Sequence, residues 1–209
     1  MTVKIAPSIL SCDFGNLNEE VESVSSADLL HIDIMDGHFV PNISFGSHVL
    51  SCIETDLPLD VHLMLTNPEK YIEKFVEIGV NRIYIHAEID GDVREILQSI
   101  IEYGVKPGLV LNIETPVSSV VEYFDVIDAV LVMGVKPGFG GQDFNYEVIE
   151  KIMELKNTVP DLKIAVDGGL NGSNCVDVAK AGADILVFGS YIFKSLNRKK
   201  VIDDLRNCH

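Results

Sequence analysis

The sequence predicts an α/β fold, with residues 1–209 forming a single (β/α)8 barrel. Eight apolar runs rich in β-branched residues alternate with segments of helical period. No linker, charge block or low-complexity stretch divides the chain, so we expect one domain. Eight strands that alternate with helices favour a closed parallel barrel, and an open doubly wound sheet is the structural alternative.

The elements follow one another in a regular order. Strands are expected at residues 3–9, 29–35, 59–64, 82–86, 106–111, 129–133, 163–167 and 185–188. Helical segments are expected at residues 16–22, 67–75, 92–103, 116–123, 145–157, 173–181 and 199–205. Asn67 before Pro68 is typical of a helix N-terminus. Gly79, Gly104 and Gly182 each follow a helical segment, where a left-handed residue commonly ends the helix.

Composition and charge narrow the class of partner. Hydrophobic residues make up 47% of the chain, but no apolar run is long enough to span a membrane. The N-terminus does not resemble a signal peptide, so we expect a cytoplasmic protein with no membrane partner. A net charge of −16 argues against nucleic acid as a partner, whereas backbone N–H groups can still hold one small phosphorylated ligand. Cys12, Cys52, Cys175 and Cys208 lack metal-site spacing and are expected to be free thiols.

The expected strand at residues 29–35 combines apolar and ionisable side chains. Because side chains alternate between the two faces of a strand, His31, Asp33 and Met35 point the same way. An imidazole and a carboxylate buried together cost several kcal/mol unless something satisfies them. A divalent metal would do so, and a hydrogen-bonded structural pair is the alternative interpretation.

In a (β/α)8 barrel the active site lies at the C-terminal ends of the strands. The strand at 59–64 carries His62, and the strand at 163–167 ends in Asp167. Together with His31 and Asp33, these residues form a set of two imidazoles and two carboxylates. We expect this set to hold one divalent ion, Zn²⁺ first, with Fe²⁺, Mn²⁺ and Co²⁺ as alternatives. His86 is expected to lie in the core or behind these ligands.

Three methionines also end strands, namely Met35, Met64 and Met133. Met35 and Met64 follow Asp33 and His62 by two residues, so they should lie just above them on the same face. Flexible thioethers would give the site an apolar lining, although ordinary core filling explains them equally well.

Three glycine clusters follow the last three strands. Gly138, Phe139, Gly140 and Gly141 lie in the loop after the sixth strand, Gly168 and Gly169 follow the seventh, and Gly189 and Ser190 follow the eighth. Lone glycines mark turns, but clusters on neighbouring loops beside a helix N-terminus are typical of a phosphate site in this fold. We therefore expect a phosphorylated substrate.

The motifs together resemble the ribulose-phosphate 3-epimerase family over nearly the whole chain. The matching stretches are IAPSILS (5–11), HIDIMDGHFVPN (31–42), DVHLM (60–64), IHAE (85–88), VKPGFGGQ (135–142), VDGGLN (166–171) and Gly189-Ser190. The resemblance implies a metal held by His31, Asp33, His62 and Asp167, and a homo-oligomer. It also implies substrate contacts from Ser8, His62, Gly138, Phe139, Gly140, Gly141, Asp167, Gly168, Gly169, Gly189 and Ser190.

Two departures leave the sugar length open. The family more often has Ser-Val-Asn-Pro where this chain has Gly134-Val-Lys136-Pro. At residues 89–92 this chain has Ile-Asp-Gly-Asp, whereas the pentulose enzymes of the family typically have a His-rich helix start. The related D-allulose-6-phosphate 3-epimerases, which form D-fructose 6-phosphate, also vary at 89–92. The expected reaction is nevertheless the interconversion of D-ribulose 5-phosphate and D-xylulose 5-phosphate.

Inversion at a carbon beside a ketone needs two proton carriers, one on each face. We expect Asp33 and Asp167 to be these carriers, exchanging the roles of base and acid with the direction of reaction. The metal would stabilise the enediolate as a Lewis acid. The competing hypotheses are a Schiff-base aldolase using Lys136 and a non-catalytic sugar-phosphate-binding barrel.

Overall fold

The computed structural model describes residues 3–207 and forms a (β/α)8 (TIM) barrel. Its strands are β1 (Lys4–Pro7), β2 (Leu30–Met35), β3 (Leu59–Met64), β4 (Arg82–His86), β5 (Lys106–Leu111), β6 (Ala129–Met133), β7 (Lys163–Asp167) and β8 (Ile185–Phe188). Six of them have the predicted bounds. The predicted first strand is shorter than expected because Ser8 caps a 3-10 helix at Ile9–Ser11.

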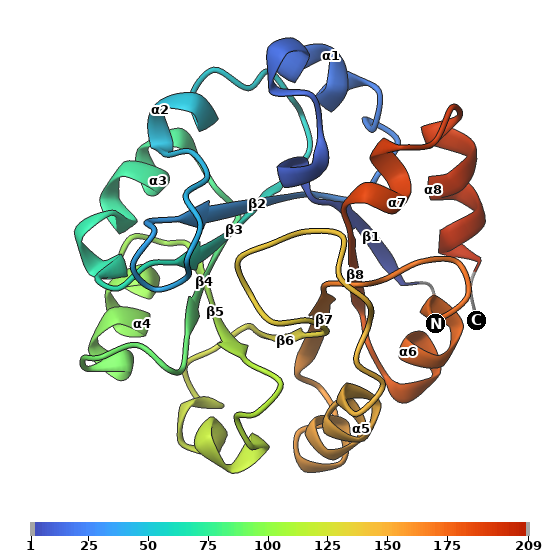
Figure 1. Ribbon diagram of the computed structural model, residues 1–209. Helices are drawn as coiled ribbons and strands as arrows, with labels where there is room; N and C mark the ends of the chain where they lie inside the picture. Colours follow the sequence, from blue (N-terminus) through green and yellow to red (C-terminus); the bar gives the residue numbers. More distant parts are fainter. Residues whose placement is uncertain (1–2, 208–209) are drawn as a thin grey trace.

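The strands pair in parallel around a ring. The sheet order is β1-β8-β7-β6-β5-β4-β3-β2, and a parallel bridge between Ser8 and His31 joins its two ends. Figure 1 looks along the ring and shows the helices outside it. This closure excludes the doubly wound sheet, whose edges remain open.

The outer layer consists of short helices and single turns. Its α-helices are α1 (Leu17–Glu22), α2 (Ser47–Leu50), α3 (Ile72–Ile78), α4 (Val93–Glu102), α5 (Val148–Thr158), α6 (Cys175–Ala181), α7 (Ser190–Phe193) and α8 (Arg198–Arg206). Gly79, Gly104 and Gly182 have positive φ after α3, α4 and α6, as predicted. Within the described residues, no helix is long and apolar enough to cross a membrane.

Two helix predictions are wrong in detail. The segment 116–123 forms two 3-10 helices, Val117–Ser119 and Val121–Tyr123, because Val120 adopts a φ of −117° between them. The segment 67–75 begins with a 3-10 turn at Pro68–Lys70 before α3, and the Asn67 side chain makes no capping hydrogen bond. The one-turn helix α2 was not expected from the sequence.

Apolar side chains fill both sides of the strands. One cluster lies between the strands and the helices, and a second fills the inside of the ring with residues such as Ala6, Val110, Leu131 and Val187. Cys12 and Cys52 are free thiols, Cys175 is buried, and Cys208 lies outside the described residues.

Buried ion pairs lie near the N-terminal ends of the strands, below the inner apolar cluster. Asp60 and Arg82 are 1% and 4% exposed, and Arg82 pairs with both Asp60 and Asp128. Lys163 at the start of β7 completes the group by pairing with Asp128. These pairs cover one end of the inner cluster, while the functional residues described below occupy the opposite end.

The close packing inside the ring generates a stability prediction for Gly108. Gly108 pairs with Tyr84, and a Cβ at this position would overlap the Tyr84 ring. We expect Gly108→Ala to lower the free energy of unfolding by about 3 kcal/mol, as overpacking of a core does. Urea unfolding followed by circular dichroism measures this change.

Gly46→Ala is the matched control, because a Cβ at Gly46 would meet no atom within 4 Å. We expect it to cost less than about 1 kcal/mol, the usual size of an N-cap change. Equal losses in the two variants would contradict the packing argument.

Candidate metal centre and active site

Four ionisable side chains converge at the C-terminal ends of β2, β3 and β7. They are His31, Asp33, His62 and Asp167, and one ligand atom from each lies within 4.8 Å of the others. Asp33 Oδ1 lies 3.4 Å from His31 Nε2 and 3.1 Å from His62 Nδ1. Asp167 Oδ2 lies 3.8 Å from both of these nitrogens. The sequence prediction that these four residues meet is therefore matched by their positions.

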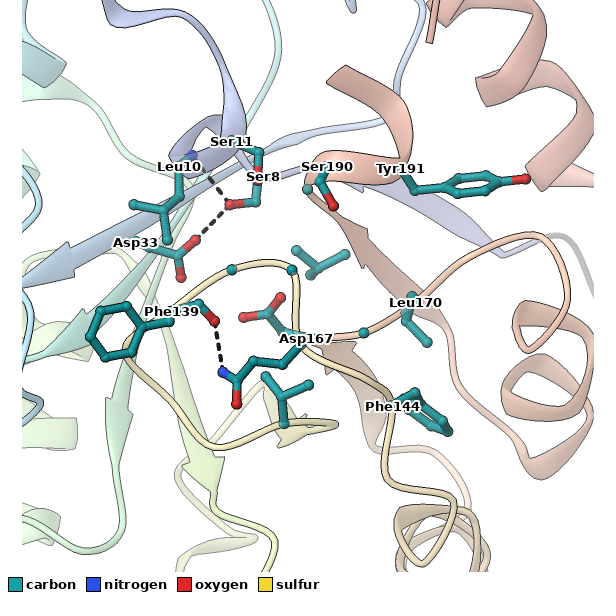
Figure 2. Close-up of a pocket in the computed structure, with 18 of the residues that line it drawn as sticks. Ser8, Leu10, Ser11, Asp33, Phe139, Phe144, Asp167, Leu170, Ser190 and Tyr191 are labelled. Carbon is teal, nitrogen blue, oxygen red and sulfur yellow. Dashed lines mark hydrogen bonds between the residues drawn. The ribbon is translucent and has the colours of Figure 1, made fainter. Parts of the chain in front are cut away.

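Strand register explains this convergence. Asp33 pairs with His62 across β2 and β3, and Asp167 is the last residue of β7. Because alternate residues of a barrel strand point inward, His31 and Asp33 both enter the ring. The bridge between Ser8 and His31 brings the end of β1 beside β2. Ser8 Oγ consequently donates a hydrogen bond of 2.6 Å to Asp33 Oδ2, as Figure 2 shows.

Burial and mutual charge set the protonation of the cluster. Burial lowers the pKa of His31, but the charge and hydrogen bond of Asp33, together with the charges of Asp167 and Asp60, raise that pKa to about 9. Burial opposes ionisation of Asp33 too, yet the charges and hydrogen bonds of His31 and His62 together hold the pKa of that carboxyl well below its usual range. Burial and the charge of Asp33 raise the pKa of Asp167 to about 7. Burial, with a contribution from His86, lowers the pKa of His62 to about 4.

The cluster fits a divalent cation. His31 Nε2 is buried and has no hydrogen-bond partner within the described residues, which is the state of a nitrogen directed at a metal. A Zn²⁺ ion bonded at roughly 2.0–2.2 Å would hold its ligand atoms about 3–4 Å apart, similar to the separations found here. Two nitrogen and two oxygen donors also suit Fe²⁺, Mn²⁺ and Co²⁺.

A cavity of about 460 Å³ opens above the cluster. Asp33 and Asp167 both line it, and Figure 2 shows their carboxylates directed toward the same space. Met35, Met64 and Met133 line it as well while remaining at most 4% exposed, so they also fill the core. His31 and His62 are buried and are not part of this lining.

The glycine clusters and Ser8 line the same cavity. The cavity lining includes the residues expected to bind substrate other than His62, namely Ser8, Gly138, Phe139, Gly140, Gly141, Asp167, Gly168, Gly169, Gly189 and Ser190. The loop after β6 extends over the mouth of the barrel in Figure 1. Gly138 O accepts a 2.7 Å hydrogen bond from Asn42 Nδ2, which ties this loop to the one after β2.

Some lining residues were not expected from the sequence. Leu10 and Ser11 follow β1, Gln142 and Phe144 belong to the loop after β6, and Lys194 follows α7. Gln142 Nε2 donates to the carbonyls of residues 136 and 139 and so shapes that loop. Gln142 ends the motif VKPGFGGQ (135–142), which pointed to this loop. Its two hydrogen bonds could not be predicted because they depend on the conformation of the whole loop.

The residues that depart from the family pattern, Gly134, Lys136 and residues 89–92, do not line the cavity, whereas Val135 and Pro137 in the first segment do. Lys136 is exposed, and Asp92 caps α4 by accepting a 3.0 Å hydrogen bond from Glu95 N. Gly134 lies beside the site for a steric reason, since a Cβ there would overlap the Gly168 carbonyl and the Phe144 ring. The departures thus change the surroundings of the cavity rather than its lining.

Comparisons with known proteins agree with this geometry. The model of the Ribulose-phosphate 3 epimerase family matches residues 4–193. The chain is 46% identical to "Ribulose-phosphate 3-epimerase" of Bacillus subtilis (strain 168), with 98% of each chain covered. It is 40% identical to the protein of that name from Escherichia coli (strain K12), covering 97% of this chain and 94% of the other.

Solved structures at low identity show the same fold. A 3-hexulose-6-phosphate synthase superposes with a TM-score of 0.72 at 15% identity, covering 99% of both chains. Orotidine 5'-phosphate decarboxylase from Pyrococcus horikoshii OT3 superposes with a TM-score of 0.70 at 14% identity, covering 98% of both chains. The matches in sequence show that the chain belongs to the ribulose-phosphate 3-epimerase family and is an isomerase, a carbohydrate epimerase.

Proposed function

We propose that this protein interconverts D-ribulose 5-phosphate and D-xylulose 5-phosphate, a step of the pentose phosphate pathway, by moving protons at C3. The observation that carries the proposal is that the two carboxylates of the His/Asp cluster, which come from β2 and β7, face one cavity. Inversion of a carbon requires a proton carrier on each of its faces. The strands β1 and β8 separate β2 from β7 in the ring, so Asp33 and Asp167 can approach the carbon from different sides.

Asp33 serves as the base in one direction of the reaction. Ser8 holds its Oδ2 atom, while its Oδ1 atom faces the two histidines. Both oxygens are thereby fixed, which orients the carboxylate toward a bound substrate. Asp167 returns a proton to the opposite face of C3, and the two residues exchange roles in the reverse direction.

His31, Asp33, His62 and Asp167 would hold the divalent ion, for which Zn²⁺ is our first candidate. Such an ion, when bound, supplies Lewis-acid stabilisation for the negative charge that develops on the substrate oxygens. The methionine lining and the loop after β6 limit the access of water to the carbanion-like intermediate.

The phosphate end of the substrate would lie against the glycine-rich loops. Gly168 and Gly169 line the cavity, and neither carries a side chain that would keep a phosphate away from its backbone N–H group. Ser190 begins α7 on the same side of the cavity. We also propose that His62 supports the substrate only through the metal cluster, because its side chain is buried.

The rival functions have weaker support. Lys136 is exposed and does not line the cavity, which disfavours a Schiff-base aldolase. A binding protein without activity would not need two carboxylates facing the same space. D-Allulose 6-phosphate remains the alternative substrate, since residues 89–92 lie outside the cavity lining. The homo-oligomer and the cytoplasmic location expected from the sequence stay predictions.

Hydrogen exchange at C3 tests the two-carboxylate mechanism. In D₂O we expect Asp33→Asn and Asp167→Asn each to reduce epimerisation by about 10²–10⁴-fold, the usual contribution of a general base. Each variant keeps one carboxylate, so it should still exchange the C3 proton of one epimer, and the two variants should differ in which epimer exchanges. NMR of each purified epimer measures this exchange, with Asp90→Asn, an exposed position, as control. Exchange of both epimers in both variants would end the proposal.

Removal and return of metal tests the ligand set. We expect chelation to abolish turnover and Zn²⁺, Co²⁺, Mn²⁺ or Fe²⁺ to restore it. His31→Ala should weaken Co²⁺ binding by at least about 100-fold, because it removes a direct ligand rather than a supporting group. The exposed His48→Ala is the matched control. Titration followed by the Co²⁺ absorption spectrum gives the affinities, and equal binding by both variants would exclude His31 as a ligand.

Substrate choice is tested by direct comparison of two sugar phosphates. We expect kcat/KM for D-ribulose 5-phosphate to exceed that for D-allulose 6-phosphate in the metal-loaded enzyme. Coupled assays that detect D-xylulose 5-phosphate and D-fructose 6-phosphate give the two values. A higher value for the six-carbon sugar would reassign the substrate while leaving the proton-transfer mechanism in place.

A further inference from the structure

A series of hydrogen bonds connects the His/Asp cluster to residues outside the cavity lining. His62 Nε2 lies 2.8 Å from His86 Nε2, and His86 Nδ1 lies 3.0 Å from Glu88 Oε2. His86 is fully buried at the end of β4, and the Phe39 ring lies over it at a centroid distance of 4.6 Å. His86 and Glu88 are not part of the cavity lining, so the substrate does not explain them.

At Glu88, the far end of this series of hydrogen bonds, the donor and the acceptor of each bond are fixed. Glu88 Oε1 accepts hydrogen bonds from the backbone N–H of Asn112, at 2.9 Å, and from the Thr115 hydroxyl. An ionised carboxylate only accepts hydrogen bonds, so the contact with Glu88 Oε2 requires His86 Nδ1 to carry the proton.

The loop that supplies these donors is held in place by α5. Lys151 Nζ donates to the carbonyls of Asn112, Ile113 and Thr115 at 2.6–2.7 Å. Glu88 therefore meets its partners in one orientation, with Oε1 toward the loop and Oε2 toward His86.

The proton on His86 Nδ1 in turn determines which nitrogens of His86 and His62 donate and which accept. In a neutral His86 with the proton on Nδ1, Nε2 is an acceptor, so His62 Nε2 must be the donor in the bond between the rings. A neutral His62 with its proton on Nε2 has a lone pair on Nδ1. That nitrogen lies 3.1 Å from the acceptor Asp33 Oδ1, and a cation between the two reconciles them.

We propose that Glu88, acting through His86, is a positioning residue that fixes the tautomer of His62 and so directs the Nδ1 lone pair of His62 at the metal. Hydrogen bonds of this kind orient a ligating histidine and set which of its nitrogens is available. The proposal rests on the metal centre described under the proposed function. It assigns to Glu88 a role in metal affinity without any contact with substrate.

Glu88→Gln is a sharp test because the amide has one acceptor atom and one donor group. The backbone N–H of Asn112 can only donate, so the glutamine oxygen turns toward it and the NH₂ group faces His86 Nδ1. The proton of His86 then moves to Nε2, His62 Nε2 becomes an acceptor, and the His62 proton moves to Nδ1. The variant thus blocks the nitrogen that should bind the metal.

We expect Glu88→Gln to weaken Co²⁺ binding by about 10–100-fold, the usual effect of losing such a supporting contact. Glu114→Gln, an exposed change in the same loop, should keep wild-type affinity. Equal affinity of the wild type and Glu88→Gln would overturn the positioning role. If the wild type bound no Co²⁺, the metal centre itself would be overturned together with this role.

The tautomers give a readout that a purely structural role of Glu88 would not change. In the metal-free wild type labelled with ¹⁵N-histidine, we expect NMR to find His62 protonated on Nε2 and His86 on Nδ1. In Glu88→Gln both assignments should be reversed. A wild-type His62 protonated on Nδ1, or a doubly protonated His86, would overturn the proposal even if the variant failed to fold.

Discussion

The burial of His31, Asp33 and His62 beside the partly exposed carboxylate of Asp167 is the constraint on which the site depends. Such groups are costly inside a protein unless each lone pair and each proton has a partner. Ser8 provides one for Asp33, and His86 provides one for His62, whereas His31 Nε2 has none within the described residues. The space between these four side chains is therefore suited to a bound cation.

The barrel provides this environment by dividing its interior into zones. Ion pairs of Arg82 with Asp60 and Asp128 occupy the N-terminal end, an apolar cluster fills the middle, and the His/Asp cluster lies at the C-terminal end. The apolar middle separates the two charged zones. The cavity lies above the His/Asp cluster, and the apolar cluster fills the barrel below it. A small molecule can therefore reach the His/Asp cluster from the cavity side.

Local patterns predicted most of the fold and the convergence of the His/Asp cluster. Strand alternation is a local property, so His31 and Asp33 could be placed on one face before the structure was known. The Ser8–Asp33 hydrogen bond was not predicted because it requires closure of the ring between residues 25 positions apart. The role of Glu88 was missed for a similar reason, since its partner Thr115 follows a different strand. The helix expected at 116–123 failed because the backbone at Val120 interrupts it.

The three hydrogen bonds of Lys151 extend the site into the outer layer of the protein. Lys151 belongs to α5, yet it holds the loop whose donors orient Glu88. Hydrogen bonds thereby connect α5, in the outer layer, through this loop and Glu88 to the buried His86. Under the role proposed for Glu88, metal affinity can consequently be changed by evolution or by engineering from the outer layer, without altering any residue that lines the cavity.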